Sequence, residues 1–167
     1  MKWKRRYFLS TLAVFALIFS CREPLVEEVA AEDNFKNETL KRVNALRAEG
    51  RKCGDKSHAA APALVWNDKL EKAAKRHSKD MANNDHFDHE GTDGSDFWQR
   101  IKDADYEPTT GGENIAWGHR SAAEAIDGWS KSPGHCRNMM NANYKEIGVA
   151  EKDGYWTMVL ATKSGSN

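Results

Sequence analysis

The apolar positions of the chain repeat first at helical spacing and later at strand spacing. Spacings of three and four residues over 35–49 predict a first helix that ends at Gly50. The same spacing over 70–81 predicts a second helix, capped by Asn67. His77 lies on the apolar stripe of that helix, so we expect a core histidine whose ring is satisfied by hydrogen bonds.

Shorter helices are predicted further along the chain. Ser95 is expected to cap one of them. Ser121, with Glu124 three residues later, forms the capping box of the next. Ser132 then caps a final helical turn with Pro133 at its first position, where the missing N–H costs nothing.

Three segments in the second half of the chain are predicted to be strands. The segment GGENIAWGH, residues 111–119, places its odd positions, Glu113 among them, on one face. The segments EIGVAE and YWTMVLATK, residues 146–151 and 155–163, are joined through the hairpin dipeptide Asp153-Gly154. Helices early and central with strands late predict an α+β fold, a three-layer α-β-α sandwich with mixed or antiparallel strand pairing.

The first twenty residues have the layout of a secretory signal. Four positive charges over residues 2–6 precede an apolar run over 9–19 and a small residue before Cys21. The apolar run is well short of the ~20 residues that span a bilayer as a helix. Its ending IFSC resembles a bacterial lipobox, which predicts cleavage after residue 20 and lipid attachment at Cys21, with ordinary signal cleavage as the alternative.

Removal of this signal leaves 147 residues, enough for one domain with a core. The remaining 21 basic and 25 acidic residues give a net charge of −4, so bulk charge recruits neither nucleic acid nor an anionic membrane. Residues 21–34 hold five acids and one arginine without periodicity, which predicts a solvated acidic tether before a domain over 35–163 and a tail over 164–167. We expect a monomer held in the bacterial cell envelope by its lipid. The outer membrane is preferred, because Arg22 stands where an aspartate would, by analogy with enteric bacteria, favour the inner membrane.

Two cysteines remain beside Cys21. In an oxidising envelope Cys53 and Cys136 pair as a disulfide. A zinc site formed by both cysteines and a histidine is a second interpretation. The third is a nucleophilic Cys136 activated by His135, although neighbouring side chains in a helix diverge by about 100° and are poorly placed for proton transfer. Compartment and geometry together favour the disulfide.

Six segments in register resemble the bacterial branch of the CAP superfamily, which includes cysteine-rich secretory proteins, antigen five and plant pathogenesis-related proteins. They are NALRAEGRKCG, APALVWNDKLEKAAKRHSKDMA, FDHEGTDGSDFWQRI, GGENIAWG, GWSKSPGHCRNMMN and YKEIGVA. The resemblance extends over about residues 35–163 and implies an α-β-α sandwich with a surface cleft. It also implies that the cysteine in the first loop, Cys53, is bridged to the cysteine of GHC, Cys136.

The usual cleft of this family holds two histidines and two glutamates. The resemblance assigns His89, Glu113 and His135 to three of these places, and Ser132 stands where the second glutamate is expected. His89 and His135 could hold zinc or another divalent metal, with Glu113 as a further ligand or a general base. The plainer interpretations are a salt-bridged Glu113 at a buried strand and a surface or capping His135.

Three functions remain open on the sequence. We favour a noncatalytic binder of a small hydrophobic or envelope-derived ligand, such as a lipid or sterol-like molecule, because the resemblance suggests it. The alternatives are a metal-dependent hydrolase of peptide or cell-wall material, with Glu113 and His135 as candidate catalytic residues, and a surface interaction module without cleft chemistry. Most tryptophans are expected in the core, and a minority could line a groove for a lipid tail or a glycan.

Overall fold

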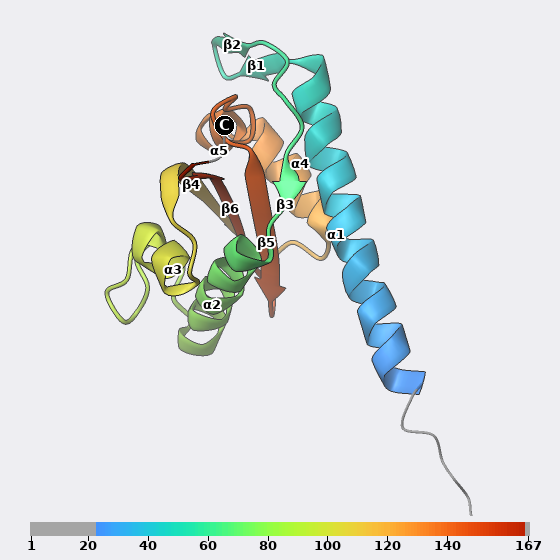
Figure 1. Cartoon of the computed structure of the whole chain (residues 1–167), viewed down its shortest axis with the longest axis vertical. Coiled ribbons are helices and arrows are strands. Elements are labelled where there is room, and N and C mark those ends of the chain that lie inside the picture. The colour runs from blue at the N-terminus through green and yellow to red at the C-terminus, as the bar shows by residue number, and fades with distance from the viewer. Residues whose placement is uncertain (1–22, 166–167) are drawn as a thin grey trace, which may run out of the picture.

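The computed structural model describes residues 23–165 (Figure 1). The predicted signal segment, the lipid attachment at Cys21 and the last two residues lie outside the described residues. The helices are α1 (Glu23–Glu49), α2 (Asp68–Asn84), α3 (Phe97–Asp103), α4 (Ala122–Lys131) and α5 (Pro133–Met139). The strands are β1 (Arg51–Cys53), β2 (Lys56–His58), β3 (Val65–Trp66), β4 (Pro108–Trp117), β5 (Glu146–Lys152) and β6 (Tyr155–Lys163). Within residues 23–165, no helix has the length and apolar character needed to cross a membrane.

The central sheet has the strand order β3-β5-β6-β4. Strand β6 pairs antiparallel with both β5 and β4, and β3 pairs parallel with β5. Strands β1 and β2 form a separate antiparallel hairpin. The prediction of mixed pairing is therefore confirmed.

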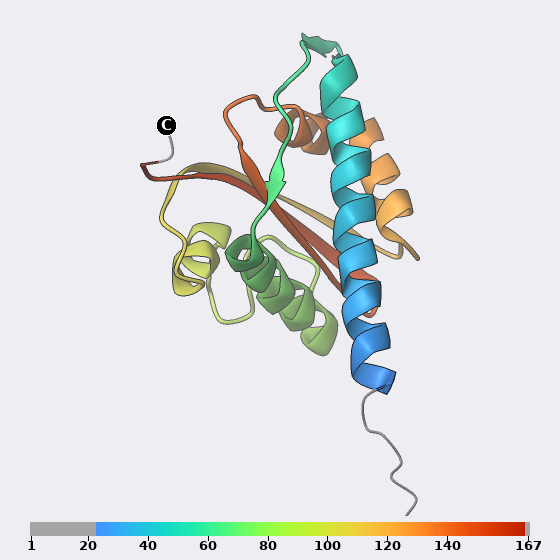
Figure 2. The ribbon, with the colours of Figure 1, turned by 45° about the vertical axis from the view of Figure 1, so that its right-hand side comes forward.

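Helices cover both faces of this sheet (Figure 2). On one face Met158 and Leu160 of β6 share a buried cluster with Trp129 of α4 and with residues of α1 and α5. On the other face Val159 and Ala161 pack in a second cluster with residues of α2 and α3. Alternate residues of one strand thus supply both cores, as the period of a strand requires. The predicted three-layer α-β-α sandwich is confirmed.

Helix α2 approaches the sheet most closely at Gly148 of β5. A Cβ atom at this position would lie 2.1 Å from the backbone nitrogen of Glu71 and 2.4 Å from the carbonyl carbon of Leu70. Only glycine therefore lets the helix backbone lie directly on the strand. Near the end of α2, Met81 shares a buried cluster with Ile115 of β4.

Helix α1 begins at Glu23, so the predicted start near residue 35 is wrong and the acidic segment expected to be a tether is helical. The side chains over 26–34 are exposed, and for this reason no apolar stripe marked them. Glu and Ala, which are strong helix formers, dominate residues 27–32. Glu32 also pairs with Lys36 one turn later and with Lys75 of α2, which ties this part of α1 to the domain.

Two of the predicted caps form and two do not. The side chain of Asn67 accepts hydrogen bonds from the first turn of α2, and the hydroxyl of Ser121 accepts one from the backbone N–H of Glu124. Helix α3 is capped by Asp96 rather than Ser95, because the Asp96 carboxylate accepts the backbone N–H three residues later. Ser132 precedes α5 as predicted but makes no side-chain capping hydrogen bond.

The disulfide between Cys53 and Cys136 joins β1 to α5. The two Cα atoms lie 5.4 Å apart, and 83 positions separate the residues in the sequence. The pairing is confirmed, and the two alternatives for Cys136, a zinc ligand and a nucleophile, are wrong. The bridge fixes α5 against the β1–β2 hairpin, so it also fixes the backbone that carries the adjacent His135.

Candidate functional site

Glu113 is the centre of the predicted cleft, and its carboxylate is paired on both oxygens. It comes from β4, and its side chain is only 2% exposed. Nη2 of Arg100, on α3, lies 2.9 Å from Oε2 and 3.1 Å from Oε1. Nδ1 of His89, in the loop between α2 and α3, lies 2.8 Å from Oε1. The carboxylate is thus the meeting point of three elements, held by charge-assisted hydrogen bonds.

Arg100 organises this junction and was not predicted from the sequence. Its Nη2 also donates to the backbone oxygen of His89 at 2.9 Å, and its Nη1 donates to that of Ser95 at 2.6 Å. It is 2% exposed and lies between Phe97 and Ile101 on the inner side of α3. The sequence does carry a signal for this residue, because an arginine on the apolar stripe of a helix is expected to be buried. A buried guanidinium in turn requires a buried acid as its partner.

The two predicted cleft histidines differ in environment. The side chain of His89 is 55% exposed, and its hydrogen bond to Glu113, opposed by partial burial, raises its pKa above the ordinary value. His135, on α5, has its pKa lowered by burial and by the nearby charge of His89. The structure therefore brings His89 and Glu113 into contact, and it places His135 close enough to His89 for their charges to interact.

Two asparagines position His135 through the backbone. The amide nitrogen of Asn114 donates to the backbone oxygen of His135 at 3.1 Å. Asn138 in turn donates to the Asn114 side-chain oxygen at 2.9 Å and to the Glu113 backbone oxygen at 3.1 Å. These amide hydrogen bonds join β4 to α5. Neighbouring side chains of a strand point to opposite faces, so Asn114 faces the side of β4 opposite to Glu113.

His77 is fully buried beneath the same junction, as expected for a core histidine. Its Nε2 lies 3.0 Å from the backbone oxygen of Asp88 and 3.8 Å from Oε1 of Glu113. Its Nδ1 has no hydrogen-bond partner within the part of the chain that the structure describes. The expectation of a satisfied ring is therefore met at one nitrogen only. Burial lowers the pKa of His77, which favours the neutral ring.

The donor atoms of the cleft do not fit a zinc centre formed by this chain alone. Zinc sites in proteins take three or four protein ligands. Across residues 23–165, no three histidine, cysteine or acidic side chains are grouped so that they could hold a metal ion. Glu113 is committed to Arg100 and to Nδ1 of His89, which leaves Nε2 of His89 and the ring nitrogens of His135 as donors.

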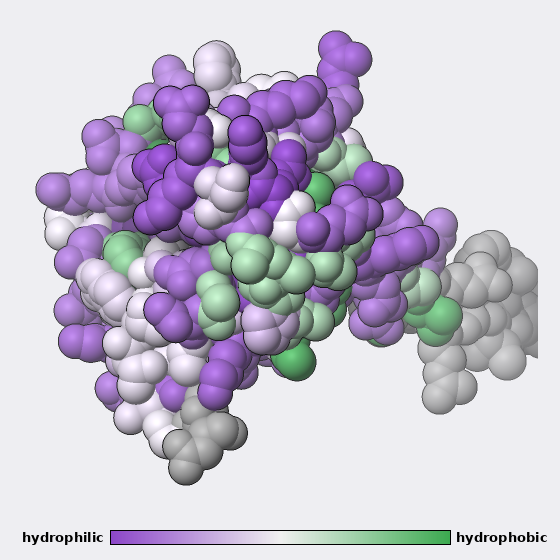
Figure 3. Space-filling view, turned by 90° about the horizontal axis from the view of Figure 1, so that it is seen from above, coloured by the Kyte–Doolittle hydropathy of each residue, from purple (hydrophilic) through white to green (hydrophobic). Residues whose placement is uncertain are grey.

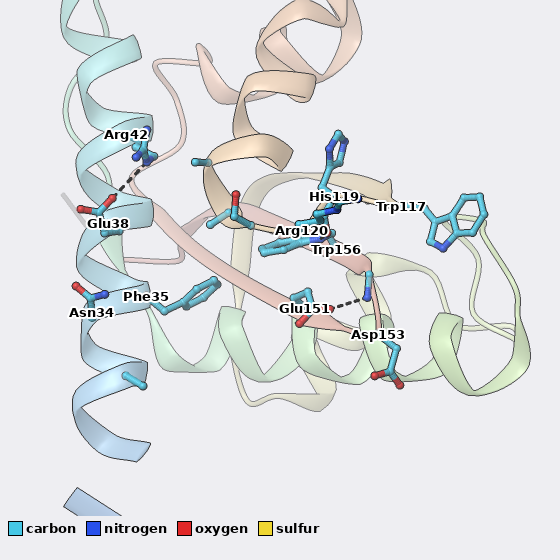
Figure 4. A pocket seen from close by; sticks show the side chains of 16 residues that line it. Asn34, Phe35, Glu38, Arg42, Trp117, His119, Arg120, Glu151, Asp153 and Trp156 are labelled. Carbon is cyan, nitrogen blue, oxygen red and sulfur yellow. Dashed lines mark hydrogen bonds and ion pairs between the residues drawn. The ribbon is translucent and has the colours of Figure 1, made fainter. Parts of the chain in front are cut away.

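A separate hollow of about 880 Å³ lies between α1, the start of α4 and the β5–β6 hairpin (Figure 4). We call it the α1–α4 groove. Its lining includes Phe35, Arg42, His119, Arg120, Ala122 and Trp156. None of the three predicted cleft residues, His89, Glu113 and His135, lines it.

Apolar rings form the floor of the groove and charged side chains form its rim. Phe35 points inward, and its ring centroid lies 6.4 Å from that of Trp156, whose Nε1 donates to the backbone oxygen of His119. On the rim Arg42 pairs with Glu38 at 3.3 Å. The Arg120 side chain is exposed, and no hydrogen bond or ion pair of its guanidinium is found among residues 23–165. The groove therefore offers an apolar floor and an available cation.

The tryptophans divide between core and surface. Trp129 and Trp156 are 1% and 4% exposed, as expected for core residues, and Trp66 is partly buried. Trp117 is 63% exposed and is one of the residues that line the groove, so it belongs to the minority of tryptophans expected outside the core. It stands at the end of β4, where the strand leaves the sheet.

Comparison with known proteins places this chain among extracellular and membrane-associated relatives. The sequence model described as CAP, the cysteine-rich secretory protein family, matches residues 40–159. The uncharacterized protein YkwD of Bacillus subtilis is 36% identical over 103 residues, which are 60% of this chain and 40% of that protein. The uncharacterized membrane protein YlbC of the same organism is 30% identical over 94 residues, 56% of this chain and 27% of that protein. This chain therefore corresponds to less than half the length of these relatives.

Solved structures share the fold. An extracellular protein with an SCP domain from Bacillus anthracis superposes with a TM-score of 0.69 at 26% identity, covering 78% of this chain and 41% of that chain. An outer surface protein from Borrelia burgdorferi superposes with a TM-score of 0.62 at 19% identity, covering 81% of this chain and 94% of that chain. The second likeness shows the fold alone.

Proposed function

Because the chain belongs to the cysteine-rich secretory protein (CAP) family, we propose that it is an extracytoplasmic, lipid-anchored protein that binds a small anionic amphiphile without catalysis. The α1–α4 groove is the proposed binding site. The N-terminal signal layout with Cys21 supports the location. The descriptions of two similar proteins as an extracellular protein and a membrane protein point the same way.

The observation that carries the proposal is the pairing of an apolar floor with an unengaged arginine. A hollow of about 880 Å³ lies within the size of small-molecule sites in proteins. Phe35 and Trp156 offer apolar contact to a hydrocarbon chain, and Arg120 can form charge-assisted hydrogen bonds with a carboxylate or phosphate. The proposed ligand therefore has one apolar chain and an anionic head group, as fatty acids and lipid fragments have.

The cleft supports a catalytic role less well. A general base needs a free lone pair directed at the substrate. Both oxygens of Glu113 are already engaged by Arg100 and His89, and the side chain is 2% exposed. We infer that these contacts hold α3, β4 and the intervening loop together.

Isothermal titration of the processed protein with palmitate tests the proposal. Phe35→Ser removes the apolar floor, and Arg120→Ala removes the head-group contact, so each should weaken palmitate binding about tenfold, the size expected for the loss of ~1.4 kcal/mol. Arg137→Ala is the matched control, because Arg137 is an exposed arginine on α5 outside the groove.

The outcomes separate the alternatives. Equal palmitate affinity in all four proteins would contradict the groove as the site. Binding of cholesterol with no binding of palmitate would contradict the anionic head group and favour a sterol-like ligand. Loss of binding in a His89→Ala, His135→Ala double variant alone would move the site to the cleft.

A further inference from the structure

Three aromatic side chains lie close together at one end of the sheet. Ring centroids of Phe87 and Tyr155 lie 6.4 Å apart, and those of Trp117 and Tyr155 lie 6.0 Å apart. Phe87 is 50% exposed and Trp117 is 63% exposed, whereas Tyr155 is nearly buried between them. We call these three residues the aromatic end patch. Single exposed apolar residues are common, but a contiguous group marks a contact surface.

The patch lies at the same end of the molecule as the beginning of α1. Trp117 ends β4, Tyr155 begins β6, and Phe87 follows the end of α2. Figures 1 and 2 both show the end of α2, the β5–β6 hairpin and the first turns of α1 at the lower end. Trp117 also lines the α1–α4 groove together with residues of α1, which brings the two surfaces together.

The exposed apolar side chains of the domain are concentrated at this end. Five large hydrophobic residues are strongly exposed among the described residues, and four of them belong to α1's first turns or to the patch: Val26 at 68%, Val29 at 59%, Phe87 and Trp117. The fifth, Val65, is on β3. Exposed apolar residues that are scattered singly are ordinary, whereas several at one end of a domain indicate a contact surface.

The chain leading to this end carries the proposed membrane attachment. Cys21 is two positions before Glu23, where α1 begins, and two residues of chain extend at most ~7 Å. The apolar run over 9–19 precedes it. A lipid on Cys21 therefore confines the first turn of α1, and the end of the domain around it, to the bilayer surface.

We propose that the aromatic end patch, with Val26 and Val29, docks this domain on the lipid surface from which its chain emerges. Tryptophan and tyrosine favour the interface of a bilayer because their rings are apolar with one polar group. Asp85 and Asp88 flank Phe87, whereas Asp153 is paired with Lys152 at 3.0 Å, so the remaining charge beside Phe87 is acidic and the fitting surface is zwitterionic rather than anionic.

This docking rests on the proposed lipid attachment and adds a route for the ligand. The groove shares Trp117 with the patch, so its opening lies beside the docked surface. An amphiphile leaving the bilayer would therefore enter the groove without crossing bulk water.

Quenching of tryptophan fluorescence by brominated lipid tests the docking. The full chain, processed by a host that lipidates proteins, is reconstituted in phosphatidylcholine vesicles whose acyl chains carry bromine, a contact quencher. The difference between the native protein and Trp117→Phe isolates one ring among the five tryptophans that remain after the signal segment with Trp3 is removed. Trp98→Phe is the matched control, because Trp98 of α3 lies near Gly111 at the opposite end of β4.

Docking predicts that most of the quenching is lost in Trp117→Phe and kept in Trp98→Phe. Protein that floats with the vesicles but shows the same quenching in all three forms overturns the docking while leaving the anchor intact. Failure to float overturns the anchor and the docking together, whereas palmitate binding in the groove is measured separately. Self-association or cell-wall glycan binding that is lost in Trp117→Ser, without lipid quenching, would assign the patch to a second copy or a glycan instead.

Discussion

The junction around Glu113 and the α1–α4 groove are two regions of one small domain whose polar groups are arranged in opposite ways. In the cleft, Arg100 and His89 satisfy the carboxylate, and the arginine also binds two backbone oxygens. In the groove, aromatic rings form the floor, and Arg120 remains available on the rim. The residues that carry the family resemblance thus stabilise a junction, while the open space for a ligand lies where no motif indicated it.

Replacement of Arg100 by methionine should have the largest effect on stability. Its direct effect should be confined to the region around Glu113, with palmitate binding in the groove unchanged. The change leaves the buried carboxylate of Glu113 without its cation, which costs about 3–5 kcal/mol when one partner of a buried pair is removed. Urea unfolding measures the loss. Palmitate affinity of the fraction that remains folded should be unchanged, because Arg100 does not line the groove.

A double variant controls for loss of packing. Arg100→Met with Glu113→Gln removes both charges, so it should recover a substantial part of the stability lost in the single variant. A single variant that costs less than about 1 kcal/mol, the range of an exposed ion pair, would show that the carboxylate is open to solvent and would favour the catalytic interpretation.

Replacement of Gly148 by alanine should come next in size. The added methyl group would lie 2.1 Å from the backbone of α2, so the helix must move, at a cost of about 1–3 kcal/mol for overpacking. Because the loop bearing His89 follows α2, the His89 pKa should fall toward its ordinary value as the contact with Glu113 loosens. An unchanged His89 titration, followed by NMR, would show that the cleft does not depend on this helix contact.

Much of the fold could be predicted from the sequence because the apolar residues on a buried face recur at the period of their helix or strand. The strand over 155–163 was predicted, and its alternate residues feed the two cores; Glu113 and Asn114 face opposite sides of β4, as the period of a strand requires. The first part of α1 was not predicted, because its side chains are exposed and its sequence has no apolar stripe at helical spacing. Local order there comes from helix-forming residues and from the ion pair of Glu32 with Lys75, which lies on another helix.

The sites were harder to predict than the layers. Only the family resemblance brought His89 and Glu113 together, because 24 positions of sequence separation say nothing about distance. Arg100 was overlooked although its place on an apolar stripe required a buried partner. The groove combines Phe35, His119 and Trp156 from three distant segments, and periodicity marks none of them as neighbours.

The pH dependence of stability should distinguish the histidines of the cleft. The pKa of His89 is raised in the folded state. Its stabilising contribution to the free energy of unfolding is therefore complete below about pH 6.5 and is lost as pH rises through the higher folded pKa. The pKa values of His77 and His135 are lowered, so their contributions are present above about pH 6.5 and are lost as pH falls. His89→Ala removes the contribution that grows as pH falls. The free energy of unfolding of this variant should therefore decrease more steeply between pH 7 and pH 5 than that of the native protein.

The same variant should raise the pKa of His135, because the nearby charge of His89 helps to lower it. Two-dimensional NMR of the ring protons measures both effects in one titration. A His135 pKa that does not change in His89→Ala would show that the two rings do not share a site.

The smallest effect is expected from His135→Ala, and this variant compares the predicted cleft with the groove directly. His135 is held through its backbone oxygen by Asn114, and alanine keeps that bond, so the thermal midpoint should shift little. The ring does not line the groove, so palmitate affinity should stay within twofold of the native value, or about 0.4 kcal/mol. Peptide or cell-wall hydrolysis by the native protein that disappears in this variant would reverse the comparison: the cleft would then be the functional site, and the groove would be a surface depression between packed elements.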